Sequence, residues 1–115
     1  MNTRVRSKET LAELLRVLAH PVRLRLMEEL SREEECVCHL TILIGKPQPY
    51  ISQQLAVLKD AGLVVDRRVA QRVFYRAADR RVANILNRLR EMSGAPAHAE
   101  EPRRPAPGCA CPKCE

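Results

Sequence analysis

The chain has 115 residues, with 20 Lys or Arg against 14 Asp or Glu, so its formal net charge is +6. This length allows one domain with a tail, and so small a core gains from association with a second copy. The sequence contains no apolar run long enough to cross a membrane and no secretory signal over residues 1–10. We therefore expect a cytoplasmic protein with reduced thiols.

Two helices are predicted at the start of the chain. Leucines recur at helical spacing over about 7–19, and a proline at Pro21, a favoured first-turn position, opens a second helix that ends near Leu30. Residues 31–35 are polar and mostly acidic, so we expect a short connection there.

Two further helices follow across a turn. An apolar stripe over 37–44 predicts a short third helix, which Gly45 closes. Residues 46–49 hold two prolines and form a turn, and Pro49 fits the first turn of a fourth helix over Gln48–Asp60. The buried edge of this fourth helix is expected to carry Ile51, Leu55 and Leu58.

The pattern then changes to that of strands. Residues 63–65 and 73–75 are rich in β-branched and aromatic side chains and flank a polar stretch, which predicts a β-hairpin. The tip at 69–71 lacks glycine, so we expect a longer or irregular loop. Asp79 is the expected N-cap of a fifth, amphipathic helix. The order predicts a mainly helical winged helix-turn-helix domain over 1–92.

The end of the chain differs in composition. Residues 93–115 are rich in proline and predict an unpacked, flexible tail that contains the cysteines Cys109, Cys111 and Cys114. Five cysteines in two tight clusters favour metal ligation or thiol chemistry over a disulfide framework in a reducing compartment.

A DNA-binding surface is predicted from the fourth helix and the hairpin. Residues 61–92 hold eight arginines against three carboxylates, a net charge of +5, which suits a polyanion. Glutamine and serine can read base edges, and arginines on a wing contact the DNA backbone or minor groove. The expected DNA-binding residues are Gln48, Tyr50, Ser52, Gln53, Gln54, Arg67, Arg68 and Arg72. An ordinary solvated polar face is the alternative.

Two thiols, Cys36 and Cys38, stand at the start of the third helix, beside the expected DNA-reading element. Thiolates bind soft metals and metalloids, and a helix N-terminus favours the thiolate form. The tail cysteines would supply the remaining ligands, so the predicted metal site comprises Cys36, Cys38, Cys109, Cys111 and Cys114. His39 either ligates or faces solvent.

Four segments carry a resemblance to a known family. They are LAHPVRLRLMEEL, ECVCHL, QPYISQQLAVLKDAGLV and RRVAQRVFYRA. They resemble the ArsR/SmtB family of metal-sensing winged-helix repressors, over most of the chain. The resemblance implies a homodimer built on the first and last helices, which represses an operon until an inducer binds. It places base-reading positions on Gln48, Tyr50, Ser52 and Gln53.

The same resemblance implies the inducer. Thiolates at Cys36 and Cys38 would bind arsenite, antimonite, cadmium or lead, and the ligand count leaves zinc open as well. The family's other common metal site lies between its last two helices. Asp79 matches its opening position, but Arg81 stands where a histidine is needed, so we expect no zinc or nickel site there.

Three alternatives remain at this point. Cys36 or Cys38 could be a small core residue, and the tail cysteines could bind metal without affecting DNA. The trigger could be oxidation of the thiols by peroxide or polysulfide. The C-x-x-C at 111–114 also occurs in thiol oxidoreductases, although it lacks the βαβ context of that class. The sequence contains no catalytic triad or phosphate-binding glycine loop, and we do not expect an enzyme.

Overall fold

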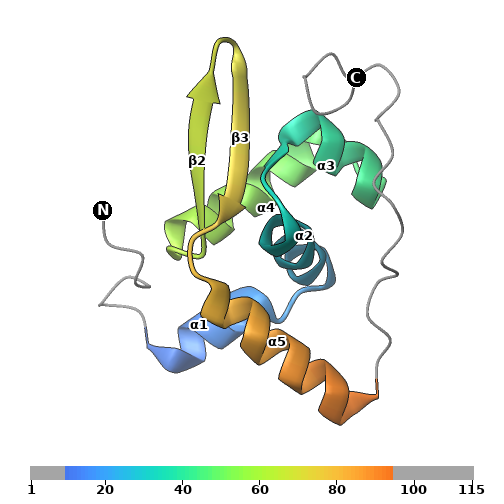
Figure 1. Ribbon diagram of the computed structural model, residues 1–115, viewed down its shortest axis with the longest axis vertical. Helices are drawn as coiled ribbons and strands as arrows, with labels where there is room; N and C mark the ends of the chain where they lie inside the picture. Colours follow the sequence, from blue (N-terminus) through green and yellow to red (C-terminus); the bar gives the residue numbers. More distant parts are fainter. Residues whose placement is uncertain (1–9, 95–115) are drawn as a thin grey trace.

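The computed structural model describes residues 10–94, which form five helices and a three-stranded sheet (Figure 1). In chain order the elements are α1 (Leu11–Leu18), α2 (Pro21–Arg32), β1 (Glu35–Cys36), α3 (Val37–Ile44), α4 (Gln48–Asp60), β2 (Val64–Val69), β3 (Arg72–Ala77) and α5 (Arg80–Ser93). This is the winged helix-turn-helix predicted from the sequence. Helices α3 and α4 form the helix-turn-helix, and β2 and β3 form the wing.

The helix ends follow from short polar residues and glycine. Thr10 Oγ1, His20 Nδ1 and Asp79 Oδ1 accept hydrogen bonds of 3.1, 3.2 and 2.8 Å from backbone N–H groups in the first turns of α1, α2 and α5. Gly45 ends α3 at φ +75°, a left-handed conformation that glycine adopts without a steric penalty. Asp79 and Gly45 were both predicted in these roles.

The sheet contains a strand that the sequence did not predict. The strand order is β1-β3-β2, and β1 pairs antiparallel to β3, with Glu35 opposite Tyr75 and Cys36 opposite Phe74. The expectation of a plain connection over 31–35 is therefore wrong. Helix α2 continues to Arg32, and only Glu33 and Glu34 connect it to the sheet. Since β1 has only two residues, no local periodicity could reveal it.

The wing has a tighter turn than expected. Val69 pairs with Arg72, so only Ala70 and Gln71 form the loop. Ala70 has φ +55°, the positive value that two-residue hairpin turns require and that usually selects glycine. The prediction of a longer or irregular loop is therefore wrong. Continuous pairing of β2 with β3 from Val64 to Val69 offsets a strain of about 1–2 kcal/mol at this alanine.

The core lies between α2, α3, α4 and the base of the wing. Its innermost apolar side chains are at most 1% exposed, and they are Leu26, Met27, Leu40, Ile51, Leu55, Leu58, Leu63 and Val64. Ile51, Leu55 and Leu58 are the predicted inner edge of α4. Within residues 10–94, no helix is both long and apolar enough to cross a membrane.

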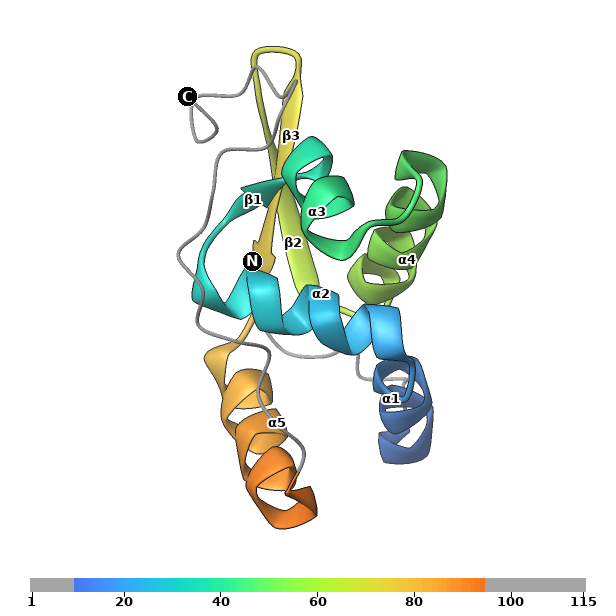
Figure 2. The same ribbon diagram turned by 90° about the vertical axis from the view of Figure 1, so that its right-hand side faces the viewer.

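The two ends of the molecule differ. The wing extends from one end, while α1 and α5 lie at the opposite end, and α2 crosses the region between them (Figures 1 and 2). Helix α3 lies beside the middle of the sheet, and α4 lies beyond it (Figure 2). The predicted DNA-binding and dimerising parts are thus separate surfaces.

Candidate nucleic-acid interface and thiol site

The helix-turn-helix is held by its shared core and by a rigid turn. Leu40 of α3 and Ile51 and Leu55 of α4 belong to one buried cluster. Between the helices, Gly45 takes its left-handed conformation and Pro47 is extended at φ −59° and ψ 147° before α4 begins. Glycine and proline adopt these φ and ψ values readily wherever they occur. The conformation of the turn therefore depends on these two residues and not on distant contacts.

The outer face of α4 presents most of the predicted base-reading residues to solvent. Gln48, Ser52 and Gln53 are exposed, and Tyr50 is half-buried with its ring packed against the core. Amide and hydroxyl groups on one helix face can donate to and accept from base edges in a major groove. The N-terminal half of α4 thus has the chemistry and the accessibility that direct readout requires.

Gln54 departs from the sequence-based expectation. It was expected on the exposed face, but its side chain is only 8% exposed. Its Oε1 accepts a hydrogen bond of 2.8 Å from Nε of Arg23 on α2. A helix turns by about 100° per residue, so Gln54 lies next to the buried Leu55 edge rather than beside Ser52. We therefore leave Gln54 out of the base-reading surface.

The wing carries the predicted arginines, and one of them is paired. Arg67 and Arg68 are exposed and Arg72 is half-buried. The Arg67 guanidinium donates two hydrogen bonds of 2.7 Å to the carboxylate of Glu34 and lies 5.6 Å from the centre of the Phe74 ring. The hydrogen bonds that Arg67 donates to Glu34 raise the pKa of Arg67. Arg67 is therefore held in a fixed position on the wing.

A second ion pair joins α4 to the wing. Lys59 Nζ lies 3.0 Å from Oδ2 of Asp66, and both residues are partly solvent-exposed. The hydrogen bond with Asp66 raises the pKa of Lys59. Exposed pairs of this kind contribute little to stability, but this one ties the end of the reading helix to the first strand of the wing.

The two cysteine side chains of the predicted sensor lie together. Cys36 is 2% exposed at the end of β1, and Cys38 is half-buried in the first turn of α3. Their Sγ atoms are 2.8 Å apart. Two thiolates that share one tetrahedral ion at about 2.3 Å each lie about 3.8 Å apart, so these sulfurs would have to separate by about 1 Å to bind an ion together.

His39 neither faces solvent nor completes this group. It is 2% exposed, and its Nδ1 lies 2.8 Å from Oε1 of the fully buried Glu35. Over residues 10–94 there is no cluster of three or more His, Cys, Asp or Glu side chains that could hold a metal ion. The other predicted ligands, Cys109, Cys111 and Cys114, lie outside the described residues.

Asp79, which matches the opening position of the family's other metal site, is engaged by its neighbour. The Arg81 side chain donates to both carboxylate oxygens of Asp79, and the Arg81 backbone N–H donates to one of them. The Arg81 side chain, followed by its backbone N–H, lowers the pKa of Asp79. This carboxylate thus serves as a helix cap.

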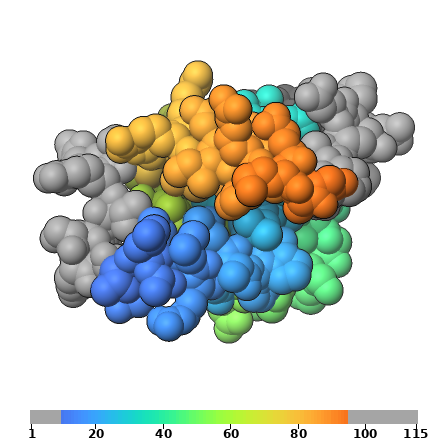
Figure 3. Space-filling model, turned by 90° about the horizontal axis from the view of Figure 1, so that it is seen from below, coloured from blue at the N-terminus to red at the C-terminus, as the bar shows by residue number. Residues whose placement is uncertain are grey.

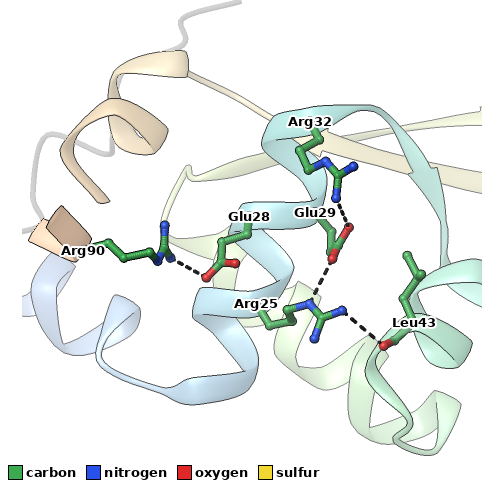
Figure 4. A network of polar contacts seen from close by, with 6 residues as sticks. All are labelled: Arg25, Glu28, Glu29, Arg32, Leu43 and Arg90. Carbon is green, nitrogen blue, oxygen red and sulfur yellow. Dashed lines mark hydrogen bonds and ion pairs between the residues drawn. The ribbon is translucent and has the colours of Figure 1, made fainter. Parts of the chain in front are cut away.

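Polar contacts of α2 reach both neighbouring helices (Figure 4). Glu29, only 4% exposed, accepts a hydrogen bond of 2.9 Å from Arg25, whose Nη2 donates to the carbonyl of Leu43 at 3.5 Å. On the other side of α2, Glu28 accepts from Arg90 of α5. Helix α2 is therefore joined by charged hydrogen bonds to the C-terminal end of α3 and to α5.

Sequence reasoning missed the partners that hold these functional residues. Arg23 and Glu34 lie 31 and 33 positions from Gln54 and Arg67, and no local pattern links residues so far apart. The Glu35–His39 pair was missed as well, because Glu35 lies in β1 and His39 in α3, so helical spacing does not predict their contact.

Comparisons with known proteins agree with this architecture. Residues 20–65 match a family described as bacterial regulatory protein, arsR family. Over 74 residues the chain is 43% identical to the HTH-type transcriptional repressor SmtB of Mycobacterium tuberculosis, covering 64% of this chain and 55% of that protein. The chain thus spans about half the length of this relative.

Two further proteins align with this chain over a larger share of both sequences. The chain is 44% identical over 78 residues to a biofilm growth-associated repressor of Xylella fastidiosa, covering 68% of each protein. The crystal structure of the transcriptional repressor BigR from Xylella fastidiosa superposes on this chain with a TM-score of 0.68 and 40% sequence identity. The superposition covers 76% of this chain and 87% of the BigR chain. The chain therefore belongs to the ArsR/SmtB family, whose members are DNA-binding transcriptional regulators and not enzymes.

Proposed function

We propose that this protein is a homodimeric repressor that leaves its operator when a thiophilic metal or metalloid ion binds Cys36 and Cys38. The observation that supports it best is the position of these two cysteines. Cys36 ends a strand of the wing sheet, and Cys38 lies in the first turn of α3, with 2.8 Å between their Sγ atoms. An ion bound there acts on both DNA-binding elements at once.

The operator contacts would come from α4 and the wing. Gln48, Ser52 and Gln53 are exposed on one side of α4 and would read base edges, together with the edge of Tyr50. The wing arginines Arg67, Arg68 and Arg72 would contact the backbone or the minor groove.

Dimerisation would use the helices at the other end of the molecule. Apolar side chains there are unusually exposed for a small domain, and they are Leu11 (71%), Leu15 (49%), Ile85 (57%), Leu89 (49%) and Met92 (82%). They belong to α1 and α5, which both lie on the face of the molecule that Figure 3 shows. Pairing these helices across a two-fold axis would bury the apolar side chains. It would also place two α4 helices about 34–36 Å apart on a near-palindromic operator.

The inducer would be arsenite, antimonite, cadmium, lead or zinc. Thiolate sulfur selects such soft or borderline ions over hard ones. Two ligands are too few for a closed site, so Cys109, Cys111 and Cys114 would supply the rest. The 17 residues from Met92 to Cys109 reach roughly 56–61 Å when extended, which permits ligation within one subunit or across the dimer.

Release would follow from movement of β1 against α3. Cys36 pairs with Phe74 in β3, and Phe74 lies opposite Arg67 in β2, so a shift of Cys36 is passed across the sheet to a wing arginine. Cys38 moves α3, which packs on α4. A tenfold loss of operator affinity needs only about 1.4 kcal/mol of coupling, which a small displacement of either element can supply.

The test is a titration of the reduced protein bound to DNA from its own promoter, followed by fluorescence anisotropy. One of the five ions should release the DNA. The Cys36→Ser, Cys38→Ser double variant should bind the DNA within about twofold of the wild type and stay bound when the ion is added. A triple serine variant of the tail cysteines is the companion, and it should need more ion for release. Release from the double variant at the wild-type ion concentration would refute the site.

The close approach of the two sulfurs also supports a second candidate, a repressor released by thiol oxidation. A peroxide can oxidise two adjacent thiols to a disulfide while it is reduced to water. Release by peroxide under metal chelation, reversed by a dithiol reductant, would favour this trigger. Release by an ion under strict exclusion of oxidants would favour the metal.

A further inference from the structure

Arg23 joins three helices through one guanidinium group. From the first turn of α2, its Nε donates 2.8 Å to Oε1 of Gln54 in α4, and its Nη1 donates 3.2 Å to the carbonyl oxygen of Val17 in α1. Its backbone N–H is itself held by the capping His20, at 3.4 Å. Hydrogen bonds therefore hold both the backbone of Arg23 and two nitrogen atoms of its guanidinium group.

Both acceptors need this arginine. The carbonyl of Val17 lies in the last turn of α1, where its helical donor four residues on would be Pro21, which has no N–H. The amide of Gln54 is buried, and a buried amide without a partner is costly. Arginine satisfies both because its donors point in different directions within one rigid plane, whereas a lysine ammonium is a single point.

The position of Gln54 makes this contact relevant to DNA. It follows Ser52 and Gln53, which are exposed on the proposed base-reading face of the same helix turn. The guanidinium thus links the inner side of the reading turn to the end of α1, a helix of the proposed dimer interface. In the proposed dimer, the angle between the two-fold axis and α4 would depend on this link.

We infer that Arg23 is a positioning residue for operator recognition, which sets the orientation of α4 relative to α1 through Gln54 without touching DNA. The inference rests on the proposed function, since it needs α4 to read bases. If it holds, loss of the link should weaken specific binding more than non-specific binding. Base readout depends on helix orientation, whereas general attraction to phosphates depends on charge.

The test measures the affinity of each variant for operator DNA and for unrelated duplex DNA over a series of salt concentrations. The melting temperature of each variant checks that it folds. Arg23→Lys and Gln54→Leu should each weaken operator binding about tenfold, equivalent to about 1.4 kcal/mol. The affinity for unrelated DNA and the slope of log K against log salt should not change. The double variant should be no weaker than either single variant, because both remove the same contact.

Two further variants separate positioning from general structure. Gln54→Glu keeps an acceptor for Arg23 and should bind the operator within about threefold of the wild type. Arg32→Lys changes an α2 arginine that pairs with Glu29 instead of with α4, and it should leave operator binding unchanged. If Arg23→Lys does not fold, the comparison of Gln54→Leu with Gln54→Glu still tests the link.

Several results would overturn the inference. Unchanged operator binding in Gln54→Leu, additive losses in the double variant, or an equal loss of affinity for unrelated DNA in Arg23→Lys would each do so, the last because it indicates a general effect on DNA binding and not one on base readout. In these cases Gln53→Ala should still weaken operator binding, which leaves the proposed function standing. If Gln53→Ala and Ser52→Ala are also without effect, the assignment of α4 as the reading helix fails as well.

Discussion

At the scale of single residues, Asp79 shows how one side chain can begin a helix and carry a pH dependence. Its carboxylate caps α5 and is bound by the Arg81 guanidinium and backbone N–H. These hydrogen bonds favour the ionised form, so the pKa of Asp79 is lower in the folded protein than its ordinary value of 3.8. The stabilisation is present above the unfolded pKa and is lost as the pH falls through the folded pKa.

We therefore expect Asp79→Ala to lower the melting temperature at neutral pH, with the deficit relative to wild type shrinking as the pH falls below 3.8. Circular dichroism melts over an acid series would measure this difference. Asp79→Asn keeps a capping oxygen without the charge and should show a smaller deficit at neutral pH. A deficit for Asp79→Ala that is the same at every pH would contradict the assigned role.

Gly45 is the residue on which the helix-turn-helix turn depends. Its φ of +75° is unfavourable for residues with a Cβ, although a Cβ placed there would meet no atom within 4 Å. Gly45→Ala should thus lower the free energy of unfolding by about 1 kcal/mol through backbone strain alone. Gly45→Asn should cost less, because asparagine tolerates this conformation. Urea denaturation would measure both, and an equal loss in the two variants would point to a cause other than φ.

At the scale of elements, the wing is joined to the segment that carries the thiols. Strand β1 supplies the edge of the wing sheet, and Glu34, directly before it, holds Arg67 of β2. A phosphate group on DNA offers the same bidentate geometry to a guanidinium as the Glu34 carboxylate does. In the proposed DNA complex, Glu34 and the DNA backbone would therefore compete for Arg67.

This competition gives a prediction with a definite sign. Glu34→Gln should strengthen DNA binding severalfold, because Arg67 can then bind a DNA phosphate. The slope of log K against log salt should not become shallower. Arg67→Ala should weaken binding to operator and unrelated DNA alike and reduce the salt slope by about one. Glu33→Gln removes a neighbouring charge and is the control. If it strengthens binding as much as Glu34→Gln does, general electrostatics rather than the Arg67 contact is responsible.

At the scale of the whole molecule, the exposed apolar side chains of α1 and α5 predict the assembly. Ile85→Glu with Leu89→Glu should convert the proposed dimer into a monomer, because carboxylates cannot be buried there without partners. Sedimentation velocity would show the change, and operator affinity should fall with it. Asn84→Glu, an exposed change on the same helix, should leave the dimer intact. A double variant that sediments as a dimer would exclude this interface.

Local pattern accounts for the elements that the sequence predicted correctly. The stripe of Ile51, Leu55 and Leu58, the cap at Asp79 and the stop at Gly45 depend on neighbours within one or two turns. The wing strands were recognised from side-chain type, but the tight turn at Ala70 was not, since pairing across the hairpin and not the turn residues imposes it. The pair Cys36 and Cys38 was identified from spacing, and its sulfurs do lie together.

The sequence by itself determined the order of helices and wing, the polar face of α4 and the cysteine pair, because each of these features depends on residues that are close together along the chain. Only the tertiary structure decided that Glu35 and Cys36 join the sheet, that Gln54 turns inward to Arg23, and that Glu34 holds Arg67. These contacts join residues more than thirty positions apart. They depend on how the elements pack, and packing geometry leaves no periodic trace in the sequence.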